Sequence, residues 1–291
     1  MLKMRKTLPA TGSSSILFSS GEMQSWIETQ ELLKKRLIAE NDFSWKLSIE
    51  KEENKETQLR YVGGVDVSYP KTDDVSAVCG TLVVVDLLSF EVVYCDSSFA
   101  KVDVPYIPGF LAFREAPILL GLLEKMKLNW NQLYPQLLMV DGNGLLHPRG
   151  LSNFKYSFDI TMTNDHKYTI AGFGLACHIG VSANLPTIGI GKNLHEVDGL
   201  SRSKVRQSLE IGVNEGKDSV ILQGDSGVIW GAALLSAKNT KNPIFVSVGH
   251  RISLETSLDV TKMLCKFRVP EPIRQADLRS RELLRKSCKC N

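Results

Sequence analysis

The sequence predicts an α/β fold in which a mixed sheet is flanked by helices. Three apolar runs, residues 61–69, 75–86 and 91–94, are separated by turn-rich pieces and predict an antiparallel meander. After the third run, apolar segments with helical spacing alternate with short apolar strands. At 291 residues, the chain has room for one large domain with short extensions, because domains usually have about 50–250 residues.

The first helix is expected to begin at a capping-box pattern, in which Ser25 is followed three residues later by Glu28, and to run to about Glu40. The later helices are expected at residues 110–126, 173–181, 204–210 and 253–267, and the later strands at residues 137–140, 187–190, 220–223, 228–236 and 244–248. Three strands followed by strands that alternate with helices is the order of ribonuclease H-like folds, although other α/β folds share it.

Composition sets the expected domain boundaries. Residues 1–21 contain no acidic side chain and end in serine-rich sequence, so we favour a disordered extension over residues 1–22 rather than a weak transit peptide. The catalytic domain is expected at residues 23–285, and a flexible tail at residues 286–291. No run approaches the ~18 apolar residues that a membrane span needs, which predicts a soluble protein.

Charge and cysteine usage leave the partner open. The net charge is only +3, so a nucleic-acid partner would need a local basic surface. The six cysteines are scattered, apart from Cys288 and Cys290, and no secretory apolar segment is found. We therefore expect a reduced, intracellular compartment, namely the cytoplasm and nucleus, with the nucleolus as a further compartment. A monomer is the plainer expectation. Zinc at the closing Cys-Lys-Cys would need a second Cys or His pair, so a frayed tail is favoured there.

Two aspartates interrupt apolar strands. Asp66 lies between valines, where burial of an unpaired charge would cost several kcal/mol, and Asp141 ends the strand at residues 137–140. Neighbouring strands lie about 4.8 Å apart, so the two carboxylates can converge on Mg²⁺ or Mn²⁺, which prefer oxygen ligands. Gly142 would let a phosphate backbone approach closely. A buried lysine partner for Asp66 and a simple turn at Asp141 are the alternatives.

Three further side chains have suitable chemistry for a site. Glu115 lies in an apolar helical stripe and needs a partner; the alternative is a cap for a helix that restarts near Pro117. His250 follows an apolar strand and could orient water or protonate a leaving group. Lys192 follows another strand and could pair with a phosphate. A structural histidine and a solvated lysine are the corresponding alternatives.

An aromatic residue and two prolines form a short segment at Pro105, Tyr106, Ile107, Pro108 and Gly109. Two prolines make the turn rigid and exposed, so it buries little of its own apolar surface. Proteins that inspect one base unstack it, and an inserted aromatic or apolar side chain can fill the gap. The segment is therefore a candidate wedge, and a loop whose tyrosine packs onto the sheet is the alternative.

Four segments, taken together, resemble the endonuclease V family. They are Gly64-Val65-Asp66-Val67-Ser68-Tyr69, the run from Pro105 to Glu115, Asp141-Gly142-Asn143-Gly144 with His147-Pro148-Arg149-Gly150, and Gly249-His250-Arg251. Residues 224–227 and 270–277 are also similar, so the likeness extends from about Trp26 to Arg285. The order and spacing of these segments make the resemblance specific.

The resemblance implies a metal-dependent endonuclease that hydrolyses the second phosphodiester bond 3′ to an inosine and leaves 3′-hydroxyl and 5′-phosphate ends. It implies that Asp66, Asp141 and Glu115 bind Mg²⁺, with Mn²⁺ able to substitute. It further implies that His250 assists the attacking water or the leaving oxygen, and that Lys192 holds the scissile phosphate. It also implies that Tyr106 is the wedge residue.

The family also suggests the substrate. Animal members, which the chain resembles more closely, prefer inosine in RNA, whereas bacterial members act on deoxyinosine in DNA. Single-stranded or structured RNA that contains inosine is therefore the expected partner, with DNA that contains deoxyinosine as a lesser substrate. The contacts that read a 2′-hydroxyl are one or two in number and are not located by the sequence.

The chain departs from the family pattern at residues 151–172, a Tyr/Thr/Asn-rich stretch directly after the second aspartate loop. An insertion in a surface loop costs little loop-closure entropy, so the fold is expected to survive. Activity is more sensitive, because a shift of a ligand loop by about 1 Å can cost about 10²-fold. An inosine-binding protein that has lost cleavage is thus an alternative function. A different ribonuclease H-like nuclease, acting on branched structures, is another.

Overall fold

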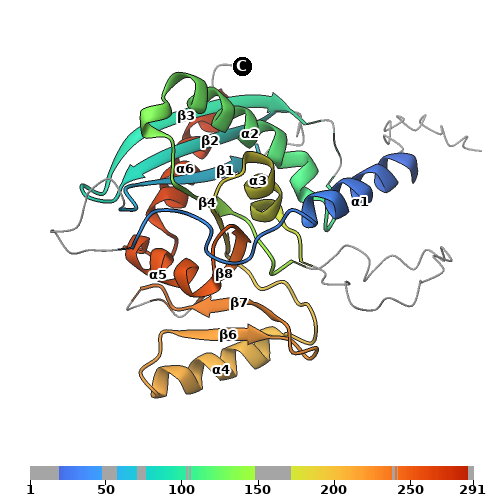
Figure 1. Ribbon diagram of the computed structural model, residues 1–291, viewed down its shortest axis with the longest axis vertical. Coiled ribbons are helices and arrows are strands. Elements are labelled where there is room, and N and C mark those ends of the chain that lie inside the picture. Colours follow the sequence, from blue (N-terminus) through green and yellow to red (C-terminus); the bar gives the residue numbers. More distant parts are fainter. Residues whose placement is uncertain are drawn as a thin grey trace, which may run out of the picture.

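The computed structural model contains an eight-stranded sheet with helices on both faces (Figure 1). It describes residues 20–47, 58–70, 77–102, 104, 106–147, 172–237, 240 and 242–287. The strands are β1 (Tyr61–Ser68), β2 (Ala77–Asp86), β3 (Glu91–Lys101), β4 (Leu137–Asp141), β5 (Thr187–Gly191), β6 (Ser219–Gln223), β7 (Ile229–Leu234) and β8 (Ile244–His250). The α-helices are α1 (Ser20–Lys34), α2 (Leu111–Asn129), α3 (Leu175–Ala183), α4 (Arg202–Asn214), α5 (Leu254–Leu264) and α6 (Glu271–Ser287).

The sheet is mixed, as predicted, with the order β3-β2-β1-β4-β5-β8-β7-β6. Strands β1, β2 and β3 form the antiparallel meander, β1, β4 and β5 run parallel, and β8, β7 and β6 continue antiparallel. The ribonuclease H-like arrangement predicted from the order of elements is confirmed. Because β1 and β4 are parallel neighbours and Val65 pairs with Val140, the residues that follow, Asp66 and Asp141, are at the same level of the sheet.

Side-chain alternation along these two strands decides which face the aspartates reach. Val65 and Val140 lie in the apolar cluster between the sheet and helices α2 and α3. Successive residues of a strand point to opposite faces, so Asp66 and Asp141 point to the other face. That face is covered by α5 and α6, and α4 covers β6 at the far end of the sheet (Figure 1).

Helix α6 approaches β1 closely because Gly64 has no side chain. A Cβ atom on Gly64 would lie only 2.2 Å from the carbonyl carbon of Pro272, in the first turn of α6. Ile273, the next residue, is fully buried in the core on this face. The start of α6 is therefore held directly against the strand that carries Asp66.

Several predicted boundaries differ from the structure, most clearly those of α1 and β3. Helix α1 runs from Ser20 to Lys34 rather than from Ser25 to about Glu40, so the last residues of the expected disordered extension are helical. The apolar contacts of α1, among them Trp26 stacked on Phe113, stabilise a helix beyond what a capping pattern alone indicates. Strand β3 continues to Lys101 rather than ending at residue 94, because polar side chains are tolerated where an edge strand faces water.

Several predictions fall on residues that the structure does not describe. These are the extension at residues 1–19, the insertion at residues 151–171 and the last residues of the chain, 288–291, with Cys288 and Cys290. Among the described helices, none combines the length and the apolar character that crossing a bilayer requires.

The close contact at Gly64 predicts a large effect of one methyl group. We expect Gly64→Ala to lower the free energy of unfolding by at least about 1–3 kcal/mol, because the added Cβ overlaps backbone rather than a flexible side chain. Gly121→Ala, on α2, is the matched control, since its Cβ meets nothing within 4 Å. The control should be neutral or stabilising by up to about 1 kcal/mol. Urea denaturation of both variants measures this, and equal stabilities would contradict the seating of α6.

Candidate metal centre

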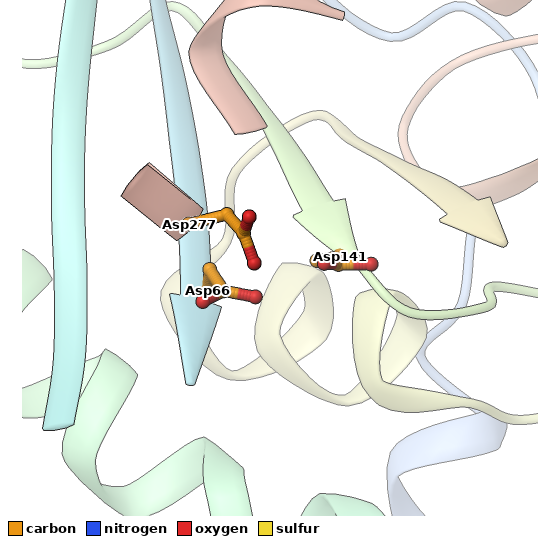
Figure 2. Close-up of side chains that lie close together, drawn as sticks. All are labelled: Asp66, Asp141 and Asp277. Atoms are coloured by element: carbon orange, nitrogen blue, oxygen red, sulfur yellow. The ribbon is translucent and has the colours of Figure 1, made fainter. Parts of the chain in front are cut away.

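Three aspartates from separate elements meet on the α6 face of the sheet. Asp66 comes from β1, Asp141 from the last position of β4 and Asp277 from α6, and Figure 2 shows their carboxylates directed toward one another. One oxygen atom from each of the three lies within 4.8 Å of the others. Strand alternation supplies the first two carboxylates, and the docking of α6 over β1 supplies the third.

The cluster concentrates negative charge where water is scarce. Asp66 is buried, with 6% of its surface exposed, and burial together with the charge of Asp141 raises its pKa to about 7. A carboxylate with so high a pKa lacks compensating positive charge. An oxygen-only set of donors at this spacing fits a hard divalent cation. The three residues are therefore a candidate site for such a cation.

Two basic side chains contact the cluster from its rim. The Nζ atom of Lys192 lies 2.5 Å from Oδ2 of Asp141 and 4.0 Å from Oδ1 of Asp277. Burial lowers the pKa of Lys192, but attraction to these carboxylates outweighs it, so the pKa is raised and the side chain stays cationic. Arg281, one helical turn after Asp277, lies 2.7 Å from Oδ1 of Asp277. Both side chains could donate hydrogen bonds to a phosphate group in place of these aspartates.

Glu115 lies close enough to Asp66 and Asp141 to feel their charges, but it comes from the opposite layer. It belongs to the second turn of α2, which runs through Pro117 without a restart, so the capping alternative is wrong. The hydroxyl of Tyr69 donates to Oε1 of Glu115 at 2.8 Å. Burial raises the pKa of Glu115 to about 7; the Tyr69 bond opposes this shift, and the charges of Asp66 and Asp141 add to it.

The structure does not bring His250 to the carboxylates. His250 pairs with Thr187, the first residue of β5, whereas Asp141 pairs with Ile190, three residues further along. The two levels are about 10 Å apart at the usual rise of a strand. His250 is buried, its Nδ1 accepts a hydrogen bond from the backbone N–H of Ile38, and burial lowers its pKa to about 4. Because β8 runs antiparallel to β5, its last residue, His250, lies beside the first residue of β5, whereas Asp141 lies near the last. This position fits the alternative of a structural histidine.

Asp277 is the residue that sequence reasoning missed. No helix was predicted after residue 267, yet α6 begins at Glu271, and Pro272 is well tolerated in the first turn of a helix. A helical stripe was present in the sequence. Its apolar or small members, Ile273, Ala276, Ser280 and Leu284, are all buried in α6, and Asp277 lies on the edge of that stripe. The stripe would have predicted a helix that carries Asp277 toward the sheet.

The predicted wedge lies just before α2, the helix that carries Glu115. Pro105 is outside the described residues, but Tyr106, Ile107 and Pro108 are described, and 62% of Tyr106 is exposed. The tyrosine is therefore not packed onto the sheet. Gly109 closes the turn with a φ of +87°, a conformation that favours glycine. Its carbonyl accepts a hydrogen bond from Nε2 of Gln30 at 3.1 Å, which ties the turn to α1.

Gly142 directly follows Asp141 and forms an isolated bridge with Ile190 of β5. Its backbone N–H donates to the carbonyl of Ile190 at 3.1 Å. The turn after Asp141 is thus held against β5, next to Lys192. This position agrees with the predicted close approach of a phosphate backbone, although the contact itself stays a prediction.

Fold and site together define a ribonuclease H-like α/β protein with a carboxylate centre suited to a divalent cation. The family model described as Endonuclease V matches residues 41–153 and 157–278. The chain is 40% identical over 262 residues to endonuclease V of Mus musculus and to that of Homo sapiens, covering 90% of this chain and 69% and 83% of the relatives. The chain belongs to the endonuclease V family, so the predicted resemblance is confirmed.

Solved structures of relatives have the same fold. Human endonuclease V superposes with a TM-score of 0.76 at 38% identity, over 91% of this chain and 99% of that one. Endonuclease V of Ciona intestinalis, in complex with a 24mer DNA that contains an inosine followed by a ribo-adenosine, superposes with a TM-score of 0.75 at 30% identity, over 92% and 99% of the two chains.

The raised pKa values predict how stability depends on pH without metal. A carboxyl group whose pKa is higher in the folded state stabilises the fold below its unfolded pKa of about 4, and this contribution is lost as the pH rises toward 7. Asp66→Asn removes one such group. In EDTA, we expect the variant to exceed the parent in free energy of unfolding by more at pH 7.5 than at pH 5.

Urea denaturation at the two pH values measures this difference. Comparing variant with parent cancels the titration of groups that the charge of Asp66 does not reach, among them the buried His250. Adding a divalent cation should shrink or reverse the difference at pH 7.5, because the cation stabilises only the protein that keeps its ligand. A difference between the two proteins that is the same at both pH values contradicts the raised pKa of Asp66.

Proposed function

We propose that this chain is an endonuclease that hydrolyses the second phosphodiester bond 3′ to an inosine, with RNA preferred over DNA that contains deoxyinosine. The observation that carries the proposal is the convergence of Asp66, Asp141 and Asp277, and the exposed turn at Tyr106 just before α2 is a second feature. A carboxylate centre supports hydrolysis of a phosphodiester, and an exposed aromatic turn supports inspection of a base. Membership of the endonuclease V family supports combining phosphodiester hydrolysis with base inspection in one protein.

Mg²⁺ is the cation we propose for the centre, with Mn²⁺ as a substitute. Asp66, Asp141 and Asp277 would hold it, and their oxygen-only donor set fits both ions. When bound, such a cation would stabilise negative charge on the scissile phosphate and lower the pKa of the attacking water. The predicted ligand set thus changes in one member, since Asp277 replaces Glu115 among the three converging carboxylates.

Glu115 is then available for proton transfer. A general base works best with a pKa near the working pH, and burial raises the pKa of Glu115 to about 7. The Tyr69 hydroxyl fixes one oxygen of Glu115, which leaves the other for the attacking water. The water oxygen would attack phosphorus as its proton passes to Glu115, and the bond from phosphorus to the 3′ oxygen would break. The 3′ oxygen would leave with the bonding electron pair and take a proton from solvent water. The products are a 3′-hydroxyl and a 5′-phosphate.

Lys192 and Arg281 are proposed to hold the phosphate backbone. Both are cations that already contact the carboxylate centre, on Asp141 and on Asp277 respectively. A cation bound between the aspartates would weaken these ion pairs, because the carboxylates would share their charge with it. The freed side chains could then pair with phosphate oxygens, Lys192 as a point charge and Arg281 through two parallel bonds.

Substrate choice rests on two features. Tyr106, with Ile107 and Pro108 beside it, would fill the space left when the inosine is unstacked. The relative from Ciona intestinalis was crystallised with a DNA in which a ribo-adenosine follows the inosine, and this single ribonucleotide next to the inosine is the support for a preference for RNA. We further propose that the enzyme acts as a monomer in the cytoplasm and nucleus, where a reducing environment suits the free thiols of the described cysteines.

A cleavage assay with matched substrates and variants tests the proposal. In Mg²⁺, the full chain should cut an oligoribonucleotide that contains inosine, cut the deoxy counterpart more slowly, and leave the adenosine version intact. Asp66→Asn, Asp141→Asn and Asp277→Asn should each lower the rate by more than about 10²-fold, since even residues behind metal ligands cost 10–100-fold. Equal cutting of inosine and adenosine would contradict the assignment.

His250→Gln is the matched control for the three aspartates. Glutamine keeps an acceptor for the N–H of Ile38, so folding should survive, and the rate should stay within a few-fold of the parent. A loss as large as that of Asp277→Asn would restore His250 as a catalytic residue.

The insertion supports a second candidate function, that of an inosine-binding protein without cleavage. Residues 151–172 directly follow the loop after Asp141, so they can displace a metal ligand without changing the fold. Under this alternative, the full chain binds inosine-containing RNA but cuts nothing in Mg²⁺ or Mn²⁺, and deletion of residues 151–172 restores cutting. Under the favoured function, the full chain cuts, and the deletion changes the rate only modestly. Gel shift and cleavage on one labelled oligonucleotide separate the two.

A further inference from the structure

A buried pair of serines contacts one oxygen of Asp66. Ser280 Oγ, from α6, lies 2.9 Å from Oδ2 of Asp66, and Ser68 Oγ, from the end of β1, lies 3.1 Å from the same oxygen. The two hydroxyls lie 2.7 Å from each other. Both side chains are buried, and Ser280 is fully inaccessible to solvent. The three oxygens form a closed triangle at the base of the metal centre.

The number of hydroxyl protons limits the directions that these three hydrogen bonds can take. Each serine has one hydroxyl proton, so an ionised Asp66 and two serines have two protons for three contacts. Ser280 donates to Oδ2 of Asp66, and Ser68 donates its one proton either to the same oxygen or to Ser280. The carbonyl of Asp277 also lies 3.0 Å from Ser280 Oγ, but a charged acceptor makes the stronger bond.

Helix geometry links this bond to the third ligand. Ser280 follows Asp277 by three residues, so both side chains are on the face of α6 that lies against the sheet. One helix therefore supplies a carboxylate to the centre and a hydroxyl that orients another carboxylate. In Figure 2, one oxygen of Asp66 points toward Asp141 and the other points away from it.

We propose that Ser280, supported by Ser68, is a positioning residue for the metal centre. Its hydroxyl holds Oδ2 of Asp66, so that Oδ1 is the oxygen presented to the cation. This inference rests on the proposed function only in that the three aspartates bind a divalent cation. Groups that orient a metal ligand typically contribute 10–100-fold to metal affinity or activity, although they never touch the metal.

The test measures metal binding without nucleic acid. Mn²⁺ is titrated into the full chain by calorimetry for the parent, Ser280→Ala, Ser68→Ala and the control Ser257→Ala. Ser257 is also fully buried, but its hydroxyl donates to the carbonyl of Ser253 within α5, away from β1. Urea denaturation of each variant separates a loss of metal affinity from a loss of folding.

We expect Ser280→Ala to weaken Mn²⁺ binding by roughly 10-fold or more. Ser68→Ala should weaken it by a few-fold, since Ser280 still donates to Asp66, and Ser257→Ala should leave it unchanged. In cleavage assays at saturating metal, the KM for the oligonucleotide should not change. If Ser280→Ala does not fold, Ser68→Ala provides the test, because it removes the supporting hydroxyl from β1 and leaves α6 intact.

The outcomes separate this inference from the proposed function. Parent-like Mn²⁺ affinity in Ser280→Ala, or in Ser68→Ala if only that variant folds, overturns the inference and leaves the nuclease intact. A parent that binds Mn²⁺, loses affinity in Ser280→Ala and cuts no inosine substrate supports the inference and overturns the function. A parent that binds no Mn²⁺ overturns both. If Ser257→Ala loses as much Mn²⁺ affinity as Ser280→Ala, the loss is a general effect of removing a buried serine. This outcome would also overturn the inference.

Discussion

Repulsion among Asp66, Asp141 and Asp277 is the constraint on which the rest of the site depends. Two unit charges about 4 Å apart repel by about 4 kcal/mol at an effective dielectric constant of about 20, and a whole domain is stable by only about 5–15 kcal/mol. The fold therefore has to supply opposing interactions. Lys192 and Arg281 supply positive charge at the rim, the serine hydroxyls support Asp66 from below, and protonation of Asp66 near pH 7 removes the remainder.

The backbone holds these charges together at little local cost. Parallel pairing of β1 with β4 places two carboxylates at one level, and alternation sends both to the same face. The third arrives because Gly64 lets the start of α6 lie against β1, which fixes the direction in which the helix continues. Each device is ordinary backbone packing in which the charged groups take no part. The arrangement is strained only electrostatically, which is the kind of strain that binding of a cation relieves.

The sequence predicted the parts of this arrangement that depend on short-range patterns. Apolar runs located the strands, and a charged residue inside an apolar strand identified Asp66 and Asp141. His250 was misplaced because it also ends an apolar strand, and only the direction of β8 in the sheet decides which edge that end reaches. Asp277 was missed because the apolar stripe that predicts α6 was not recognised, and only the long-range packing of this helix shows that the edge of the stripe faces the other two aspartates. Strand direction and helix docking are properties of the whole chain, and one-dimensional patterns do not contain them.

Helix α2 joins the two halves of the site. The exposed turn at Tyr106 leads directly into it, and Glu115 lies in its second turn, so one helix connects the residues that we propose for base inspection and for proton transfer. Gln30 of α1 and the stacked ring of Trp26 hold this segment from outside. A substrate that fails to place a base at the turn would leave its backbone unpositioned at the carboxylates. Selectivity for one base then follows from geometry, without any change in the chemistry at the metal centre.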